Sequence, residues 1–294
     1  MITKVNPKFL MGKIRPDDTF FRVNQKSEMP YHDRVLKYGC GLYFVFKTES
    51  TNIKIRYKCH FADHPVRFSK KHMVECSVMG YDKTLGEWYY MNTLNGFKPT
   101  NGKSDTVFEV DFAVTRQFDK YQVCLPENGR SYDYEIESDK PIEYEYINNS
   151  IILVGSSVAQ FCNDCNHMNL CAYMYREYGL NVATVGISSC HTFQNLVLMN
   201  FLKQQKDKMF LVVDVEHVNY SEYDKFGDFI KTMEFLVVDN LVTRTCKLLK
   251  KVHPEIIAFQ PPGNWMYDEK HMNDHGVVEY AKLIYDKYNE FKKK

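Results

Sequence analysis

The chain has 294 residues, a length that fits two domains better than one. Lys and Arg together number 38 and Asp and Glu 37, so the net charge of +1 argues against a nucleic-acid binder, which would carry a basic excess. The longest apolar run is the six residues Leu170 to Tyr175, whereas a membrane-spanning helix needs about 20. We therefore expect neither a nucleic acid nor a membrane as partner.

The first residues and the cysteines bear on the cellular compartment. The N-terminal stretch has no apolar segment of the kind that a secretory signal contains, and the nine cysteines are an odd number. We expect a cytoplasmic protein with reduced thiols rather than a disulfide framework. The 21 Tyr and 20 Phe residues favour β-sheet, because aromatic rings suit a half-buried pleated surface.

Residues 1–148 are predicted to form a β-sandwich, jelly-roll-like accessory domain. Apolar and polar residues alternate over Ile53–Cys59, Phe108–Val114, Tyr132–Glu137 and Ile142–Tyr146. Such alternation is typical of antiparallel strands with one packed face and one wet face. Turn sequences lie between the runs, at Thr100–Lys103 and Pro126–Gly129. About eight short strands with regular turns indicate a sandwich or a jelly roll.

Residues 149–294 follow a different pattern, in which strands alternate with helices. Predicted strands cover Ser150–Val154, Asn181–Val185, Met209–Val215 and Glu255–Phe259, and predicted helices cover 157–178, 192–203 and the stripe from Val277 to Phe291. The spacing of Ile230, Met233, Val237, Leu241 and Leu248 predicts a further helix. This order predicts a three-layer α/β/α domain, flavodoxin-like, with four core strands in a parallel sheet.

Small or polar residues follow each predicted strand, where the active sites of parallel sheets lie. They are Gly155-Ser156-Ser157, the segment Gly186 to His191, the segment Asp214 to Asn219, and Asp268 to His271. Ser, His and Asp together indicate acyl transfer, because a serine hydroxyl needs a base and that base needs a carboxylate to orient it. Ser157 alone would more simply be a helix N-cap.

Three of these segments resemble conserved blocks of the SGNH, or GDSL, hydrolase superfamily. Gly155-Ser156-Ser157-Val158-Ala159-Gln160 is similar to the first block, Gly186 stands where the second block has its oxyanion-hole glycine, and Asp268 to Gly276 resembles the last block. The resemblance implies that Ser157 is the nucleophile, His271 the general base and Asp268 the residue that orients His271. It implies that the backbone N–H groups of Ser157 and Gly186 bind the oxyanion.

A narrower resemblance covers bacterial members of that superfamily with an N-terminal β-sandwich. Gly39-Cys40-Gly41-Leu42-Tyr43 is similar to their Gly-x-Asp-Leu-Tyr motif, with Gly41 in place of Asp. Asp214 to Asn219 is similar to their third block, with Val218 where an oxyanion-binding Asn is usual, so that Asn219 is the displaced candidate. Glu216, His217 and Trp265 are candidates for substrate contact because they follow strand ends.

A run of possible metal ligands offers another interpretation of one segment. Cys162, Cys165, His167 and Cys171 lie within ten residues, but their spacing wraps around a helix, and buried cysteine is common. We therefore predict no metal and no cofactor. The predicted function is that of a serine esterase acting on small acyl esters, acetyl above all, on carbohydrate. One alternative is a carbohydrate O-acyltransferase that uses the same triad. The other is a glycan-binding protein that kept the fold but is catalytically impaired.

Overall fold

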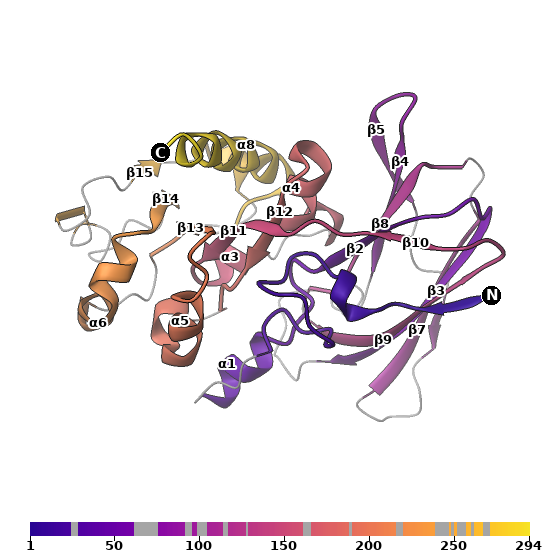
Figure 1. Cartoon of the computed structure of the whole chain (residues 1–294), viewed down its shortest axis with the longest axis horizontal. Helices are drawn as coiled ribbons and strands as arrows, with labels where there is room; N and C mark the ends of the chain where they lie inside the picture. The colour runs from indigo at the N-terminus through magenta and orange to yellow at the C-terminus, as the bar shows by residue number, and fades with distance from the viewer. Residues whose placement is uncertain are drawn as a thin grey trace.

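The computed structural model of the chain describes residues 1–24, 29–61, 76–91, 96–98, 105–113, 117–127, 129–160, 166–187, 190–215, 220–238, 247, 250–251, 257–259, 262–266 and 271–294. All structural statements below concern these residues. Within them lie three sheets, two antiparallel and one parallel (Figure 1).

The first half of the chain forms the two antiparallel sheets, each of five described strands. The first has the order β1 (Ile2–Lys4), β9 (Gly129–Ser138), β3 (Asn52–Phe61), β7 (Asp105–Ala113) and β6 (Gly96–Lys98). The second has the order β10 (Glu143–Glu145), β2 (Tyr43–Lys47), β8 (Lys120–Cys124), β4 (Ser77–Asp82) and β5 (Glu87–Met91). Two short helices, η1 (Pro7–Phe9) and α1 (Pro30–Val35), lie between β1 and β2 in the chain.

One apolar core contains residues of both antiparallel sheets. Ile53, Ile55 and Tyr57 of β3 are buried in it, while Lys54, Arg56 and Lys58 are not, as the alternating pattern predicted. Aromatic residues fill much of this core, and the rings of Tyr57 and Tyr134 stack with their centres 4.9 Å apart. The β-sandwich architecture, its jelly-roll connectivity and the boundary at residue 148 stay predictions.

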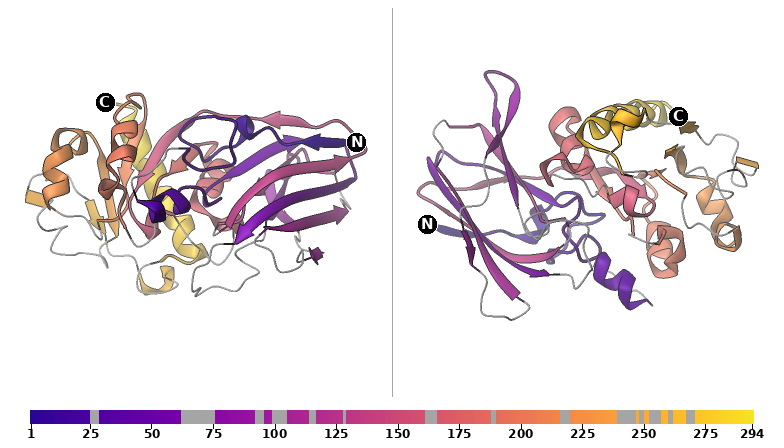
Figure 2. Two further views of the ribbon diagram at one scale, coloured as in Figure 1. Left: turned by 90° about the horizontal axis from the view of Figure 1, so that it is seen from below. Right: turned by 180° about the vertical axis from the view of Figure 1, so that it is seen from behind.

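The second half of the chain forms a five-stranded parallel sheet. Its order is β12 (Asn181–Thr184), β11 (Asn149–Val154), β13 (Met209–Val212), β14 (Glu234–Val238) and β15 (Ile257–Phe259). One face packs against α1, α5 (Leu196–Leu202) and α6 (Tyr220–Ile230), and the other against α4 (Leu170–Tyr178) and α8 (Asp274–Phe291). Figures 1 and 2 show these helices on opposite sides of the sheet. The shorter helices are α3 (Ser157–Gln160), η2 (Asn166–Met168), η3 (Thr192–Gln194) and η5 (Gly263–Trp265).

Two predictions about this sheet were wrong. The segment around Met233 and Val237 was expected to be helical, but Glu234–Val238 is the strand β14, and the described sheet has five strands rather than four. The run Phe235-Leu236-Val237-Val238 is apolar at every position, so residues chosen from it fit a helical spacing as well as a strand. A fully buried parallel strand carries no alternation that could tell the two apart.

The two halves of the chain share apolar cores. In β2, Phe44 and Phe46 face the core between the antiparallel sheets, whereas Tyr43 and Val45 face a core that contains α4 and α8. Buried hydrogen bonds cross the same contact, because the amide Nε2 of Gln122 donates to the carbonyl oxygen of Ala172 at 3.1 Å. The second antiparallel sheet is therefore covered on both faces.

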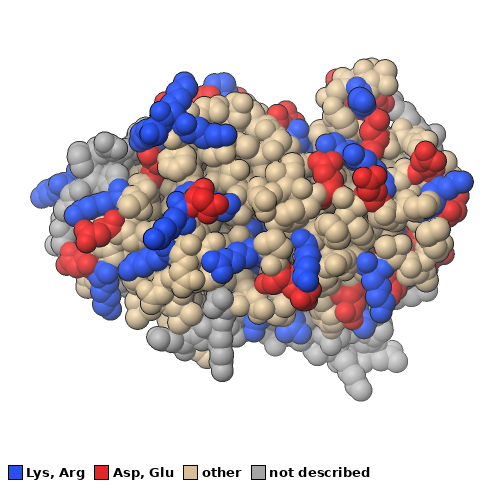
Figure 3. Space-filling view, in the orientation of Figure 1, with Lys and Arg blue, Asp and Glu red and all other residues tan. Residues whose placement is uncertain are grey.

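Two further observations concern the surface. On the face shown in Figure 3, side chains of both charges occur over the whole surface. Within the described segments, no helix combines the length and the apolar character that crossing a bilayer requires.

Candidate active site

Ser157 and His271, which are 114 residues apart in the chain, meet at the carboxyl end of β11. Ser157 is the first residue of α3, just after that strand, and His271 lies in the loop before α8. The Nε2 atom of His271 lies 3.1 Å from the Oγ atom of Ser157. Both side chains are partly exposed, so a substrate can reach them. The distance is within hydrogen-bond reach, as proton transfer from serine to histidine requires.

The backbone before Ser157 is held by buried side chains from two neighbouring segments. The N–H of Gly155 donates to the hydroxyl of Thr192 at 3.1 Å, and the N–H of Ser156 donates to Oδ2 of Asp214 at 2.8 Å. Thr192 and Asp214 are fully buried. A Cβ atom on Gly155 would lie 2.3 Å from Asp214 Oδ2, so only glycine allows this close approach.

The side chain of His191 contacts the backbone of Asp214. Its Nδ1 accepts a hydrogen bond from the N–H of Phe193 at 3.2 Å, so the proton is on Nε2, which lies 2.9 Å from the carbonyl oxygen of Asp214. His191 is thus a neutral donor that joins the chain after β12 to the chain after β13. The sequence placed His191 and Asp214 at strand ends but gave them no role, because the contact between them joins residues 23 positions apart.

The loop that carries His271 is fixed by the start of α8. Asn273 caps that helix, since its Oδ1 accepts from the N–H of Gly276 at 2.9 Å, and its own N–H donates to the carbonyl oxygen of Trp265 at 2.9 Å. Met266 and Met272 pair across the loop as an isolated β-bridge. Trp265, predicted to contact substrate, is half-buried in η5, and its ring packs edge-on against His275 at 6.2 Å.

Gly186 lies against α3, the helix that begins with Ser157. Its N–H donates to the hydroxyl of Thr184 at 3.3 Å, which is a long hydrogen bond. A Cβ atom on it would lie 2.5 Å from the carbonyl oxygen of Ser156 and 2.8 Å from the backbone nitrogen of Gln160. Close packing therefore gives one reason for glycine at this position.

Replacing Gly186 with alanine is expected to destabilise the protein by about 1–3 kcal/mol, because the added methyl group overpacks the contact with α3. Urea unfolding would measure the loss. Gly263→Ala is the matched control, since a Cβ atom there meets nothing within 4 Å and its effect should be small. If the two variants had equal unfolding free energies, the close contact between Gly186 and α3 would be contradicted.

Four predicted site residues lie outside the described residues. They are Asp268, Glu216, His217 and Asn219. The orienting role of Asp268, the oxyanion role of Asn219 and the substrate contacts of the other two therefore stay predictions.

The run of possible metal ligands is partly visible. Cys162 and Cys165 lie outside the described residues, and the part of the chain that is described holds no group of three potential metal ligands. Burial raises the pKa of the Cys171 thiol to about 12, which makes it a poor ligand. The ring of His167 packs in a tilted arrangement against Tyr90 of β5, with the ring centres 4.5 Å apart, and burial, with the nearby Arg176 guanidinium, lowers its pKa to about 4.

The lowered pKa of His167 predicts a pH dependence of stability. The folded state favours neutral His167, so its contribution is complete above the ordinary pKa of 6.5 and is lost as pH falls towards 4. We expect His167→Gln to lose less stability than the wild type between pH 7 and pH 4 in urea unfolding. If the unfolding free energies of the two proteins fell equally between pH 7 and pH 4, the lowered pKa of His167 would be contradicted.

Comparisons with known proteins bear on the fold. No protein-family model matches the sequence, and no curated protein sequence matches it. Among solved structures, one described as a GDSL-like lipase from Bacteroides ovatus has a TM-score of 0.74 at 18% identity, and the match covers 99% of this chain and 98% of that one. The chain shares the fold of this structure.

A second solved structure with a similar fold is described by a different activity. It is the salicylyl-acyltransferase SsfX3 from a tetracycline biosynthetic pathway, with a TM-score of 0.58, 14% identity, and coverage of 96% of this chain and 95% of that one. A fold alone does not decide a reaction, so the chemistry of this chain has to be argued from Ser157, His271 and their surroundings.

Proposed function

We propose that the protein is a serine esterase that hydrolyses small acyl esters, acetyl esters on carbohydrate above all. The observation that carries this proposal is the 3.1 Å separation of Ser157 Oγ and His271 Nε2, on a turn held by buried hydrogen bonds. A serine hydroxyl is a weak nucleophile at neutral pH, and an imidazole at this distance supplies the base that it needs.

In the proposed reaction Ser157 Oγ attacks the ester carbonyl carbon while its proton passes to His271 Nε2. The tetrahedral intermediate collapses, the bond from carbon to the alcohol oxygen breaks, and the alcohol takes the proton from His271. Water then attacks the acyl-serine by the same steps and releases the carboxylic acid. Asp268 is proposed to orient His271 and stabilise the imidazolium, as the carboxylate of a Ser-His-Asp triad does.

The oxyanion is proposed to bind the backbone N–H groups of Ser157 and Gly186, with Asn219 as a third donor. The long hydrogen bond from Gly186 N–H to Thr184 is weak, so a developing oxyanion can replace that hydroxyl as the acceptor. Loss of one oxyanion donor typically costs about 100- to 1000-fold in rate.

The Gly-x-Asp-Leu-Tyr-like segment is proposed to support the helix that carries Ser157. The Sγ atom of Cys40 donates to the carbonyl oxygen of Gln160, the last residue of α3, at 2.9 Å. A Cβ atom on Gly41, whose φ is +75°, would lie 2.8 Å from the Cγ2 atom of Thr184. The predicted β-sandwich would thus act on the active site through this segment.

Acetate release from acetylated oligosaccharides and from p-nitrophenyl acetate tests the proposal. We expect hydrolysis of both, with a higher kcat/KM for the carbohydrate, and covalent labelling of Ser157 by a fluorophosphonate. Absence of hydrolysis and of labelling in folded protein would reject the esterase.

Acyl transfer to an acceptor other than water is the second candidate. It is favoured by the likeness to the acyltransferase structure, which covers nearly the whole of both chains. Product analysis with a sugar acceptor present separates the two reactions, because a transferase forms the acylated acceptor where an esterase releases free acid.

A further inference from the structure

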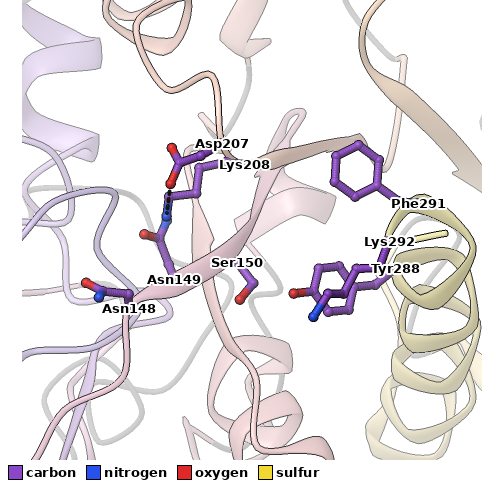
Figure 4. Close-up of a pocket in the computed structure, with 8 residues that line it drawn as sticks. All are labelled: Asn148, Asn149, Ser150, Asp207, Lys208, Tyr288, Phe291 and Lys292. Carbon is purple, nitrogen blue, oxygen red and sulfur yellow. Dashed lines mark ion pairs between the residues drawn. The ribbon is translucent and has the colours of Figure 1, made fainter. Parts of the chain in front are cut away.

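A cavity lies at the opposite end of the parallel sheet from Ser157. It has a volume of about 490 Å³ and lies between the start of β11 and the last turn of α8 (Figure 4). Ser150, the second residue of β11, lines it, and Ser157 follows seven positions later along mostly extended chain, up to about 23 Å away. Nothing in the proposed esterase reaction uses this cavity.

Three hydrogen-bond donors face one another across it. Figure 4 shows the Ser150 side chain of β11 opposite the hydroxyl of Tyr288, which points from α8 towards that strand, and the ammonium of Lys292 lies beside Tyr288. Among the described residues, the two hydroxyls have no hydrogen-bond partner. The Lys292 ammonium lies 5.5 Å from the centre of the Tyr288 ring and forms no ion pair with a described carboxylate.

Neighbouring carboxylates are already paired with other lysines. Asp207, on the rim, forms an ion pair with Lys208 at 2.9 Å. Glu234, at the start of β14, binds Lys287 at 3.2 Å and Lys294 at 2.8 Å. Lys292 therefore brings to the cavity one positive charge that pairs with no described side-chain carboxylate.

The wall of the cavity also offers apolar surface for a ring. Phe291 and Tyr288 are half-buried and line the side formed by α8. Converging donors and one uncompensated ammonium favour an anionic ligand, and the adjacent rings favour a flat or chair-shaped ring on it. We propose that this cavity binds a ring that carries one carboxylate group, with the carboxylate on Lys292, Tyr288 and Ser150.

Two kinds of molecule share this chemistry, namely an aryl carboxylic acid and an acidic sugar. Sodium benzoate and sodium glucuronate are the probes for them, and benzyl alcohol is the neutral ring for comparison. Ligand-observed NMR titration of the full-length protein gives the affinities. We expect at least one of the two carboxylates to bind at millimolar concentration and benzyl alcohol to bind more weakly. The carboxylate that binds more tightly shows whether the natural ligand is an aryl carboxylic acid or an acidic sugar.

Variants locate the binding. Lys292→Met is expected to weaken carboxylate binding about fivefold, since a partly exposed ion pair is worth up to about 1 kcal/mol. Lys293→Met, which changes the next residue but no residue of the cavity, is the matched control and should bind as the wild type does. Tyr288→Phe keeps the ring and loses one hydrogen-bond donor, so its affinity for the carboxylate should lie between those of Lys292→Met and Lys293→Met.

Binding should persist in Ser157→Ala, because the cavity and Ser157 are at opposite ends of β11. Absence of carboxylate binding, equal binding of benzyl alcohol, or equal losses in Lys292→Met and Lys293→Met would overturn the proposal. None of these measurements depends on esterase activity, so the two proposals can fail separately.

Discussion

Replacing Ser157 with alanine is expected to lower kcat for p-nitrophenyl acetate by about 10⁴-fold or more, because no nucleophile remains beside His271. The variant should fold normally, since Ser157 is partly exposed and the backbone hydrogen bonds of the turn do not use its side chain. Steady-state kinetics, with circular dichroism to verify the fold, would measure the loss.

Ser156→Ala is the matched control for that experiment. The Ser156 hydroxyl is buried and has no hydrogen-bond partner among the described residues, while its backbone N–H holds Asp214. Its removal should leave kcat within a few-fold of the wild type. Full activity in Ser157→Ala, or equal losses in both variants, would reject Ser157 as the nucleophile.

Replacing Asp214 with alanine is expected to damage both stability and catalysis. The buried N–H of Ser156 loses its acceptor, which costs about 1–3 kcal/mol. The turn that sets the distance between Ser157 and His271 loosens at the same time, so kcat should fall by about 100-fold, in line with the cost of a small displacement of reacting groups. KM should change much less, because Asp214 is fully buried and touches no substrate.

Two variants separate this positioning role from a general loss of stability. Asp214→Asn keeps an acceptor oxygen and should recover much of kcat. Asn181→Ala also removes a buried side-chain oxygen that accepts a backbone N–H at 2.8 Å, but at the amino end of β12, far from Ser157. It should lower the unfolding free energy and leave kcat of the folded enzyme unchanged. A comparable loss of kcat in Asn181→Ala would contradict the proposed role of Asp214 in positioning Ser157.

The features that the sequence predicts well are those that local chemistry determines. Alternating residues such as Ile53 to Cys59 have one buried face, and a glycine between a buried strand and a serine marks the turn before α3. The pairing of Ser157 with His271 followed from residue types at strand ends, together with a family resemblance. Each of these patterns lies within a few residues of the chain.

The features that the sequence does not predict depend on contacts between distant segments. The strand β14 is apolar at successive positions and so has no period of its own. The hydrogen bonds of His191 and Asp214 join residues 23 and 58 positions apart, and nothing near either residue indicates its partner. Likewise, residues of α1 belong to the core beneath the parallel sheet, although the sequence assigns them to the other half.

The sheet that contains β2 has a consequence for how the protein unfolds. Because Tyr43 and Val45 pack on one side and Phe44 and Phe46 on the other, neither half can separate without exposing a broad apolar face to water. We therefore expect that the two halves of the chain, on either side of the change of sequence pattern near residue 149, do not unfold independently. Thermal and chemical unfolding should show a single cooperative transition, and a fragment that begins at residue 149 should aggregate rather than fold.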